Sequence, residues 1–332
     1  MNFTLQTAVY LVVGSLGLVA PLLFPDYTIQ IAFLWLMVLF ALTWDILGGQ
    51  MGYNSFGNIL FFGLGCYVTA VLQRDTELPF FTSLAAGMGL SMIVAVAAAA
   101  ILGPLILAMR GHYFAICTLG LGIAAADIFA GWDYVGAGSG IVPRLYPGEI
   151  DERNFFYYYV LFGLAVAAFV TLDRLYRSRF GLALNAIRDD EDKAEAMGLH
   201  TIRYKVAAWM IAAFFLGLAG GPVAGLVGFV DPRDLAFAGP TFGVWMVLMA
   251  ILGGKGTLWG PVIGAVVFHI TQELFWTYFL GWQRVMLGLL IVLIVVFFPM
   301  GIMGWLRQNR PQWFGEVVEE APAGAGGDGR AA

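Results

Sequence analysis

Residues 155–173 read FFYYYVLFGLAVAAFVTLD, residues 206–228 read VAAWMIAAFFLGLAGGPVAGLVG, and between them stands RLYRSRFGLALNAIRDDEDKAEAMGLHTIRYK (174–205). Each apolar run has about the 20 residues that an α-helix needs to cross a bilayer. The middle stretch, which we call the charged segment, is dense in charge within a strongly apolar chain. We interpret it as a docking surface for a partner in the cytoplasm. The alternative is a solvated loop without a partner.

The composition of the whole chain indicates a membrane protein. The 332 residues are 60% hydrophobic and only 12% charged, and the mean hydropathy is +0.82. A soluble domain of this size would carry more surface charge. Apolar runs of about 20 residues recur, whereas the alternating segments of about 10 residues typical of transmembrane barrels do not. The sequence therefore predicts an all-α, polytopic transmembrane helical bundle without a cleavable signal at its N-terminus.

The apolar runs predict about ten membrane spans. The run 240–252 is short for a full crossing, so a tilted, broken or re-entrant element there, with nine other spans, is the alternative. We expect residues 1–304 to form the membrane domain and 305–332 a disordered cytoplasmic tail. The predicted spans lie near 5–24, 28–48, 56–72, 82–108, 112–131, 155–173, 206–228, 240–252, 260–280 and 284–304.

Lysine and arginine placement predicts the orientation, because such residues are enriched in cytoplasmic loops. With the charged segment inside, eleven of these residues are cytoplasmic and five are external, and both termini are cytoplasmic. The loop 132–154 is then external, and it is long enough to cover a cavity or meet an external partner. Five spans in each half would have opposite orientations, which fits an inverted repeat.

Residue types in the charged segment predict two short helices. Residues 182–188 suit a first helix, Asp189 or Asp190 suits the N-cap of a second, and Gly198 suits a left-handed C-terminal position. The two helices would offer four apolar side chains to a groove on a partner: Leu184, Ile187, Ala194 and Met197.

Ionisable residues within the predicted spans are few. Asp45 and Asp127 lie near span ends, while His269 and Glu273 are four residues apart and share a helix face. Such residues line a pathway or hydrogen-bond to a neighbouring helix, and both interpretations stay open. His269 and Glu273 alone do not make a metal site. The two cysteines are expected to be free thiols in the membrane.

Other signatures are absent from the sequence. There is no G-x-x-x-x-G-K-[ST] motif, so we expect no ATP hydrolysis by this chain. No catalytic constellation and no basic stripe for nucleic acid stands out. Glycines recur within the spans, where small residues allow close helix contact, either in ordinary packing or between helices that rock against each other.

Several stretches resemble the branched-chain amino acid permease family of ATP-binding-cassette (ABC) importers, and within it the LivM-type subunit. The likeness covers most of residues 30–300. The stretches are Arg179-Phe180-Gly181 with Ala186–Glu191 and Glu195–Gly198, GLAGGPVAG (217–225), MRGHYFAICTLG (109–120), ILGGKGTLWGPVIG (251–264) and residues 56–68.

The resemblance implies a coupling role for part of the charged segment. The residues expected to couple to an ATPase are Arg179, Gly181, Ile187, Arg188, Asp190, Glu191, Glu195, Ala196 and Gly198. A second set is expected to line the pathway or pack its helices: Gly63, Gly65, Tyr113, Thr118, Gly120, Gly221, Gly254, His269 and Glu273.

The resemblance also implies the partners. These are a second homologous permease, two cytoplasmic ABC ATPases that bind ATP and Mg, an external solute-binding protein, membrane lipid and a small-molecule substrate, in a bacterial inner membrane. The implied substrate is a branched-chain or other hydrophobic amino acid, with urea, short amides or small carboxylates as alternatives. An ion-coupled secondary transporter that uses Asp45, Asp127, His269 and Glu273 is the alternative from another class.

Overall fold

The computed structural model describes residues 3–279, 281–282, 285, 288–289, 292 and 301–309, and over these residues the chain is α-helical. This confirms the predicted fold class. The helices are α1 (Phe3–Leu23), α2 (Thr28–Gly48), α3 (Asn58–Asp75), α4 (Phe80–Ile106), α5 (Gly111–Ala130), α6 (Ile150–Tyr176), α7 (Arg179–Asp189), α8 (Glu191–Ala196), α9 (Thr201–Val227), α10 (Val244–Gly253), α11 (Trp259–Tyr278) and α13 (Gly301–Asn309).

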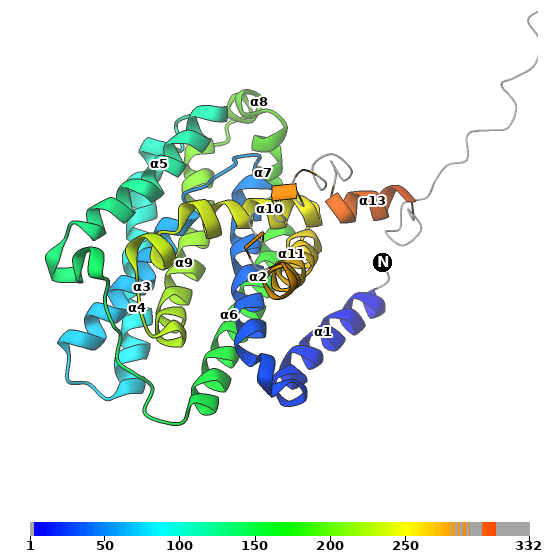
Figure 1. Ribbon diagram of the computed structural model, residues 1–332. Helices are drawn as coiled ribbons and strands as arrows, with labels where there is room; N and C mark the ends of the chain where they lie inside the picture. Colours follow the sequence, from blue (N-terminus) through cyan, green and yellow to red (C-terminus); the bar gives the residue numbers. More distant parts are fainter. Residues whose placement is uncertain are drawn as a thin grey trace, which may run out of the picture.

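The centre of the bundle is built from α2 and α9. Every residue of α2 from Leu36 to Gly48 is buried, as expected for a helix that is apolar on all sides. Helices α3, α4 and α6 run beside this pair (Figure 1). α4 and α5 lie at the edge of the bundle, where only 28% of the residues in the apolar stretch of each helix are buried.

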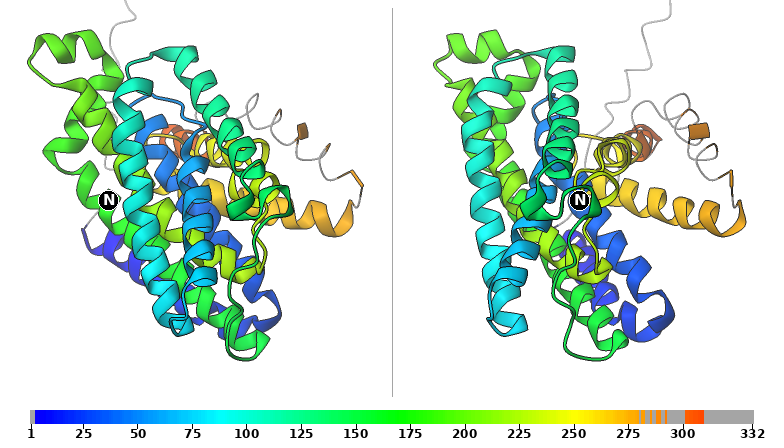
Figure 2. Two further views of the ribbon diagram at one scale, coloured as in Figure 1. Left: turned by 90° about the vertical axis from the view of Figure 1, so that its left-hand side faces the viewer. Right: turned by 60° about the vertical axis from the view of Figure 1, so that its left-hand side comes forward.

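The last helices cross the others. α10 packs against α2 and α11, and it lies across the direction of α2 and α9 (Figure 1). Figure 2 shows α11 projecting sideways from the bundle. Two irregular helical turns, η4 (Pro232–Ala236) and η5 (Gly239–Gly243), precede α10. The short run at 240–252 is therefore part of a longer apolar stretch, residues 232–253, that begins with irregular turns. This arrangement resembles the broken element that the sequence analysis gave as an alternative to a full span.

Six stretches are long and apolar enough to cross a membrane: residues 25–48, 80–106, 111–130, 150–176, 201–227 and 232–253. α3 and α11 are not among them, because polar residues such as Gln73, Arg74 and Glu273 fall within their lengths. The expected span at 5–24 corresponds to α1. The expected span at 284–304 and the tail 305–332 lie largely outside the described residues. The count of ten, the inverted repeat and the domain boundary remain predictions.

Glycines allow α3, α4 and α9 to meet closely. A Cβ added at Gly220 would lie 2.3 Å from the backbone nitrogen of Cys66, and one at Gly65 would lie 2.5 Å from the carbonyl oxygen of Gly217. Hydroxyl groups complete the junction, since the Oγ atoms of Thr69 and Ser91 are 2.8 Å apart. Ser91 Oγ also donates to the Gly65 carbonyl at 3.0 Å. Small residues thus hold three helices at backbone contact, as in other membrane bundles.

Candidate functional site

The charged segment folds into two short helices at one end of the bundle (Figure 1). Asp190 caps α8, because its Oδ1 accepts the Lys193 backbone N–H at 3.1 Å. Gly198 ends the helix with φ +89°, in the left-handed region. These features confirm the predicted helix pair. Ser178, whose Oγ accepts the Phe180 N–H at 3.2 Å and caps α7, was not predicted.

The structure corrects the expectation about which face of the segment is free. Leu184, Ile187 and Ala194 are 0%, 3% and 4% exposed, so they pack into this chain's own core. Only Met197 is open to a partner, at 87% exposure. Periodicity identifies an apolar helix face, but it does not tell which body covers that face. Ile187 therefore does not offer its side chain to a partner, and a coupling role for it remains a prediction.

The outer surface of the segment carries the remaining coupling candidates. Arg179, Arg188, Glu195 and Ala196 are exposed there, and Leu182 adds an apolar side chain that is 67% exposed. Gly181 is buried at the α6–α7 turn, where a Cβ would lie 2.4 Å from the Tyr176 carbonyl oxygen. Beside Gly198 the surface is hollowed by about 340 Å³. The hollow is lined by Phe180, Gly198, Leu199, His200, Arg203, Tyr204 and Ala207.

A buried ion pair fastens α8 to the bundle. The Lys205 ammonium lies on α9, is 2% exposed and contacts the Glu191 carboxylate. It also donates to Tyr53 Oη at 2.7 Å and to the Leu107 carbonyl at 3.1 Å. The Tyr53 hydroxyl donates to the other oxygen of Glu191. The loop between α2 and α3, the end of α4, and helices α8 and α9 therefore meet at one cluster.

Arg110 extends this cluster to α5. It immediately precedes α5, and its guanidinium lies 3.4 Å from Glu191 and 2.7 Å from Asp192. Arg110 belongs to the MRGHYFAICTLG stretch, which the sequence had singled out without a role for this side chain. We refer to Tyr53, Arg110, Glu191 and Lys205 as the anchor cluster.

The electrostatics of the anchor cluster favour an ionised Glu191. Burial raises the pKa of its carboxyl group, but hydrogen bonds from Lys205 and Tyr53 outweigh burial, and the pKa lies below its ordinary value. The pKa of Tyr53 is raised by burial and then by Glu191, so the phenol keeps its proton and remains a donor. A buried pair with added hydrogen bonds of this kind fixes geometry more than it adds stability.

The sequence contained no direct signal for the anchor cluster. The sequence places Lys205 at the end of the charged segment, whereas in the structure α9 begins at Thr201 and Lys205 lies inside a helix. Thr201 Oγ1 also donates to Glu195 Oε1 at 2.5 Å, so the start of α9 is bonded to the end of α8. The cluster joins residues up to 152 positions apart, and only the tertiary fold brings them together.

A second buried acid holds the glycine-rich turn between α10 and α11. Asp45 is fully buried, and its Oδ1 accepts the Gly256 backbone N–H at 2.7 Å. Gln50 Nε2 donates to the Gly256 carbonyl at 3.0 Å. Gly254, a candidate from the sequence, has φ +115° in the same turn. This turn therefore joins the end of α2 to the last helices.

Most of the pathway candidates take part in packing. Gly63 lies against Phe237, where a Cβ would be 2.2 Å from the ring, and Gly221 lies against Thr69. Gly65 belongs to the α3–α4–α9 junction described above. Thr118 is buried, and its Oγ1 accepts the Phe56 N–H at 3.1 Å and donates to the Ala115 carbonyl at 3.0 Å.

The other candidates lie apart from these. Tyr113 and Gly120 are on the exposed side of α5, with Tyr113 79% exposed. His269 Nε2 lies 2.9 Å from the Gln30 carbonyl and bonds α11 to α2. Glu273, one turn further on, forms no ion pair within the described part of the chain. The structure does not bring the nine candidates together into one cavity. Asp127, the remaining ionisable candidate, is exposed and paired with Arg233 at 3.0 Å.

Comparison with known proteins decides the family. Residues 28–295 match the model of a family described as "Branched-chain amino acid transport system / permease component". The chain belongs to this permease family. It is 30% identical over 302 residues to the high-affinity branched-chain amino acid transport system permease protein LivM of Salmonella typhimurium, covering 83% of this chain and 68% of that protein. The resemblance stated from the sequence is confirmed.

Two proteins of Escherichia coli add to this finding. LivM of strain K12 is 30% identical over 313 residues, covering 86% of this chain and 71% of LivM. The permease protein LivH of the same strain is 28% identical over 128 residues, covering 38% of this chain and 40% of LivH. No solved structure matches the chain. The permease family and its apolar helices make this chain a multi-pass membrane transport protein, not an enzyme.

Proposed function

We propose that this chain is one of two permease subunits of an ATP-driven uptake system for branched-chain or other hydrophobic amino acids. Two permeases of the Escherichia coli system resemble it, one along most of its length and the other over a shorter stretch. This pattern supports a second, homologous subunit beside this one. Urea, short amides and small carboxylates remain the alternative substrates.

One observation supports the proposal that uptake is driven by ATP: the two helices of the charged segment are held in place against the bundle. α7 and α8 are capped, and α8 is held by the buried Glu191–Lys205 pair, while Met197 and Leu182 face outward. A solvated loop would need no such anchor. We assign the outer surface of α7 and α8, with the hollow beside Gly198, as the place where a cytoplasmic ATPase docks.

On this proposal, the partner ATPases bind and hydrolyse ATP. The sequence holds no phosphate-binding loop, so two ABC ATPases would bind ATP and Mg, and this chain would need no cofactor of its own. Closure of the ATPase pair would push on α8, and the anchor cluster would pass the displacement to α9. An external solute-binding protein would deliver the substrate.

The orientation follows from the same assignment. With the charged segment in the cytoplasm of a bacterium, both termini are cytoplasmic, and the loop between α5 and α6 faces the outside of the inner membrane. Antiparallel hydrogen bonds between Ile141 and Val230, at 3.0 and 2.9 Å, fix this loop to the segment after α9. The loop therefore has a defined shape on which a binding protein could rest.

The alternative of an ion-coupled transporter receives no support from Asp45 or Asp127. Asp45 accepts a backbone N–H, and Asp127 is paired with Arg233 in an exposed position. Both are structural contacts.

Co-expression with the genomic neighbours, gentle detergent extraction and intact-complex mass spectrometry test the proposal. We expect a complex of this chain with a second permease and two ATPases. A chain recovered alone, or only with copies of itself, would refute the ABC assembly and leave an ion-coupled carrier as the better account.

A further inference from the structure

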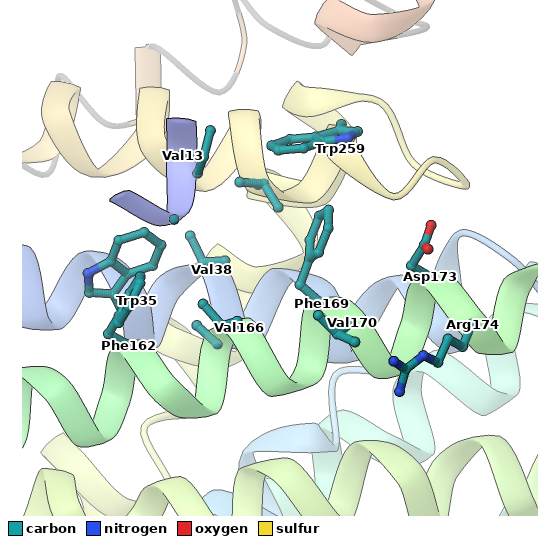
Figure 3. A pocket seen from close by; sticks show the side chains of 13 residues that line it. Val13, Trp35, Val38, Phe162, Val166, Phe169, Val170, Asp173, Arg174 and Trp259 are labelled. Atoms are coloured by element: carbon teal, nitrogen blue, oxygen red, sulfur yellow. The ribbon is translucent and has the colours of Figure 1, made fainter. Parts of the chain in front are cut away.

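A groove opens between α1, α2, α6 and α11, outside the sites described above (Figure 3). Its volume is about 390 Å³, and apart from Asp173 and Arg174 its lining is apolar. The lining residues that matter below are Trp35, Phe162, Val166, Phe169, Arg174 and Trp259.

One end of the groove is closed by the contact of α1 with α6. A Cβ at Gly17 would lie 2.3 Å from the Phe162 ring, and Tyr158 Oη donates to the Gly17 carbonyl at 2.6 Å. Trp35 Nε1 donates to Tyr158 Oη at 3.0 Å, so the polar atoms here are satisfied. Away from this contact α1 diverges from the bundle (Figure 1). From the α1–α6 contact the groove runs along α6 from Phe162 to Arg174, toward the end carrying the charged segment (Figure 3).

The open end carries an uncompensated positive charge. Asp173 is neutralised by Arg177, at 2.8 Å on the same helix. Arg174 has no ion-pair or hydrogen-bond partner among the residues that the structure describes, and it is exposed at the mouth. Trp259 packs on Phe169, with ring centroids 4.9 Å apart, at the same end. An arginine and a tryptophan at the end of a spanning helix are typical of the lipid headgroup level.

We infer that this groove binds an anionic glycerophospholipid, with one acyl chain along α6 and the phosphate on Arg174. The apolar walls suit an acyl chain, and the free guanidinium suits a phosphate, which it can bind through two N–H groups. A zwitterionic amino acid would need partners for both of its charged ends, and Asp173 is already occupied by Arg177. The site lies on the flank of the bundle, apart from the anchor cluster.

Native mass spectrometry of the assembled complex tests this inference. The complex is delipidated in mild detergent and titrated with dioleoylphosphatidylglycerol or dioleoylphosphatidylethanolamine. We expect one phosphatidylglycerol retained per chain, with retention at least about tenfold weaker in Arg174→Gln, the loss typical of one charged hydrogen bond. Arg153→Gln, which removes a charge from the opposite end of the same helix, should retain the lipid like the wild type.

A second pair of variants tests the acyl-chain part. Val166→Trp fills the groove and should abolish retention, whereas Ile101→Trp adds the same bulk on α4, where Ile101 is 70% exposed, and should not. Equal retention in Val166→Trp and the wild type would mean that another segment covers the groove, and the inference would fail. Displacement of the lipid by leucine would assign the groove to substrate and would equally overturn it.

Discussion

Lys205 of α9 forms a buried ion pair with Glu191 of α8, inside a cluster that also holds Tyr53 and Arg110. The pair joins a helix on the surface of the charged segment to a helix at the centre of the bundle. It is one of the contacts through which force on the segment would reach the membrane domain.

Removal of one partner from this pair should destabilise the protein strongly. The Glu191 side chain is only 11% exposed, and Lys205→Met removes the ammonium group that neutralises it. Leaving a buried charge unpaired in this way costs about 3–5 kcal/mol of folding free energy. The double variant Lys205→Met/Glu191→Gln should recover part of the loss. Thermal unfolding of the purified complex measures both. Lys193→Met, which breaks the exposed pair with Asp190, is the matched control and should change stability by less than about 1 kcal/mol.

Stability should also fall with acid through Glu191. The pKa of its carboxyl is below the ordinary 4.5 in the folded protein, so its contribution is fully present above pH 4.5. That contribution is lost as the pH falls through the folded pKa, because protonation removes the charge that pairs with Lys205. Unfolding temperatures recorded from pH 7 to pH 4 check this. Glu191→Gln should show a shallower decline below pH 4.5 than the wild type, and parallel curves would contradict the assignment.

The glycine junction of α3, α4 and α9 should not accept a methyl group. Gly220→Ala places a carbon 2.3 Å from backbone, so the helices must move apart, at a cost of about 1–3 kcal/mol. Gly120→Ala, on a face of α5 with nothing within 4 Å, is the control and should be neutral or slightly stabilising. Both variants gain the same helix propensity, so the difference between their unfolding temperatures measures the steric clash at Gly220. Equal unfolding temperatures would show that the helices at the junction have room for a methyl group.

Asp45 should serve as a hydrogen-bond acceptor for the Gly256 N–H and not as a proton carrier in transport. Asp45→Asn keeps an oxygen for the Gly256 N–H and should retain uptake, whereas Asp45→Ala leaves that donor unpaired and should destabilise the fold by about 1–3 kcal/mol. Uptake and thermal stability are measured in both variants. Loss of uptake in a stable Asp45→Asn protein would instead indicate a proton-carrying group.

The outer surface of the charged segment should decide ATPase docking. Met197→Asp puts a charge on the side chain that is 87% exposed, which cannot disturb the core but should lower retention of the ATPases in a pull-down by about tenfold or more. Leu145→Asp, on the external loop and 68% exposed, should leave ATPase retention unchanged. Unaltered retention in Met197→Asp would exclude this surface from docking.

The sequence predicted the local features of the charged segment well, because capping depends on residue type alone. Asp190 and Gly198 take the positions that their chemistry favours. The orientation of the helix faces could not be predicted in this way. Ile187 and Leu184 form an apolar stripe that fits either a partner or this chain's own core, and only the fold shows that the core covers it.

The anchor cluster and the groove were beyond prediction for a related reason. Lys205 and Tyr53 are far apart in sequence, and each alone is an ordinary residue near the end of a helix or in a loop. The family resemblance identified the stretches that contain Arg110 and Glu191. It did not indicate that these residues meet, because a motif records residue types and not contacts.

The continuity of α9 has a mechanical consequence. The helix runs for 27 residues without a break, through Pro222, and it carries Lys205 near one end and the Gly220 contact further along. At 1.5 Å per residue these two points lie about 22 Å apart. A rod of this kind does not absorb a push between them. Pushed at Lys205, it would work as a lever whose fulcrum is the glycine junction, and a small tilt at that end would become an opposite swing in the seven residues from Gly221 to Val227.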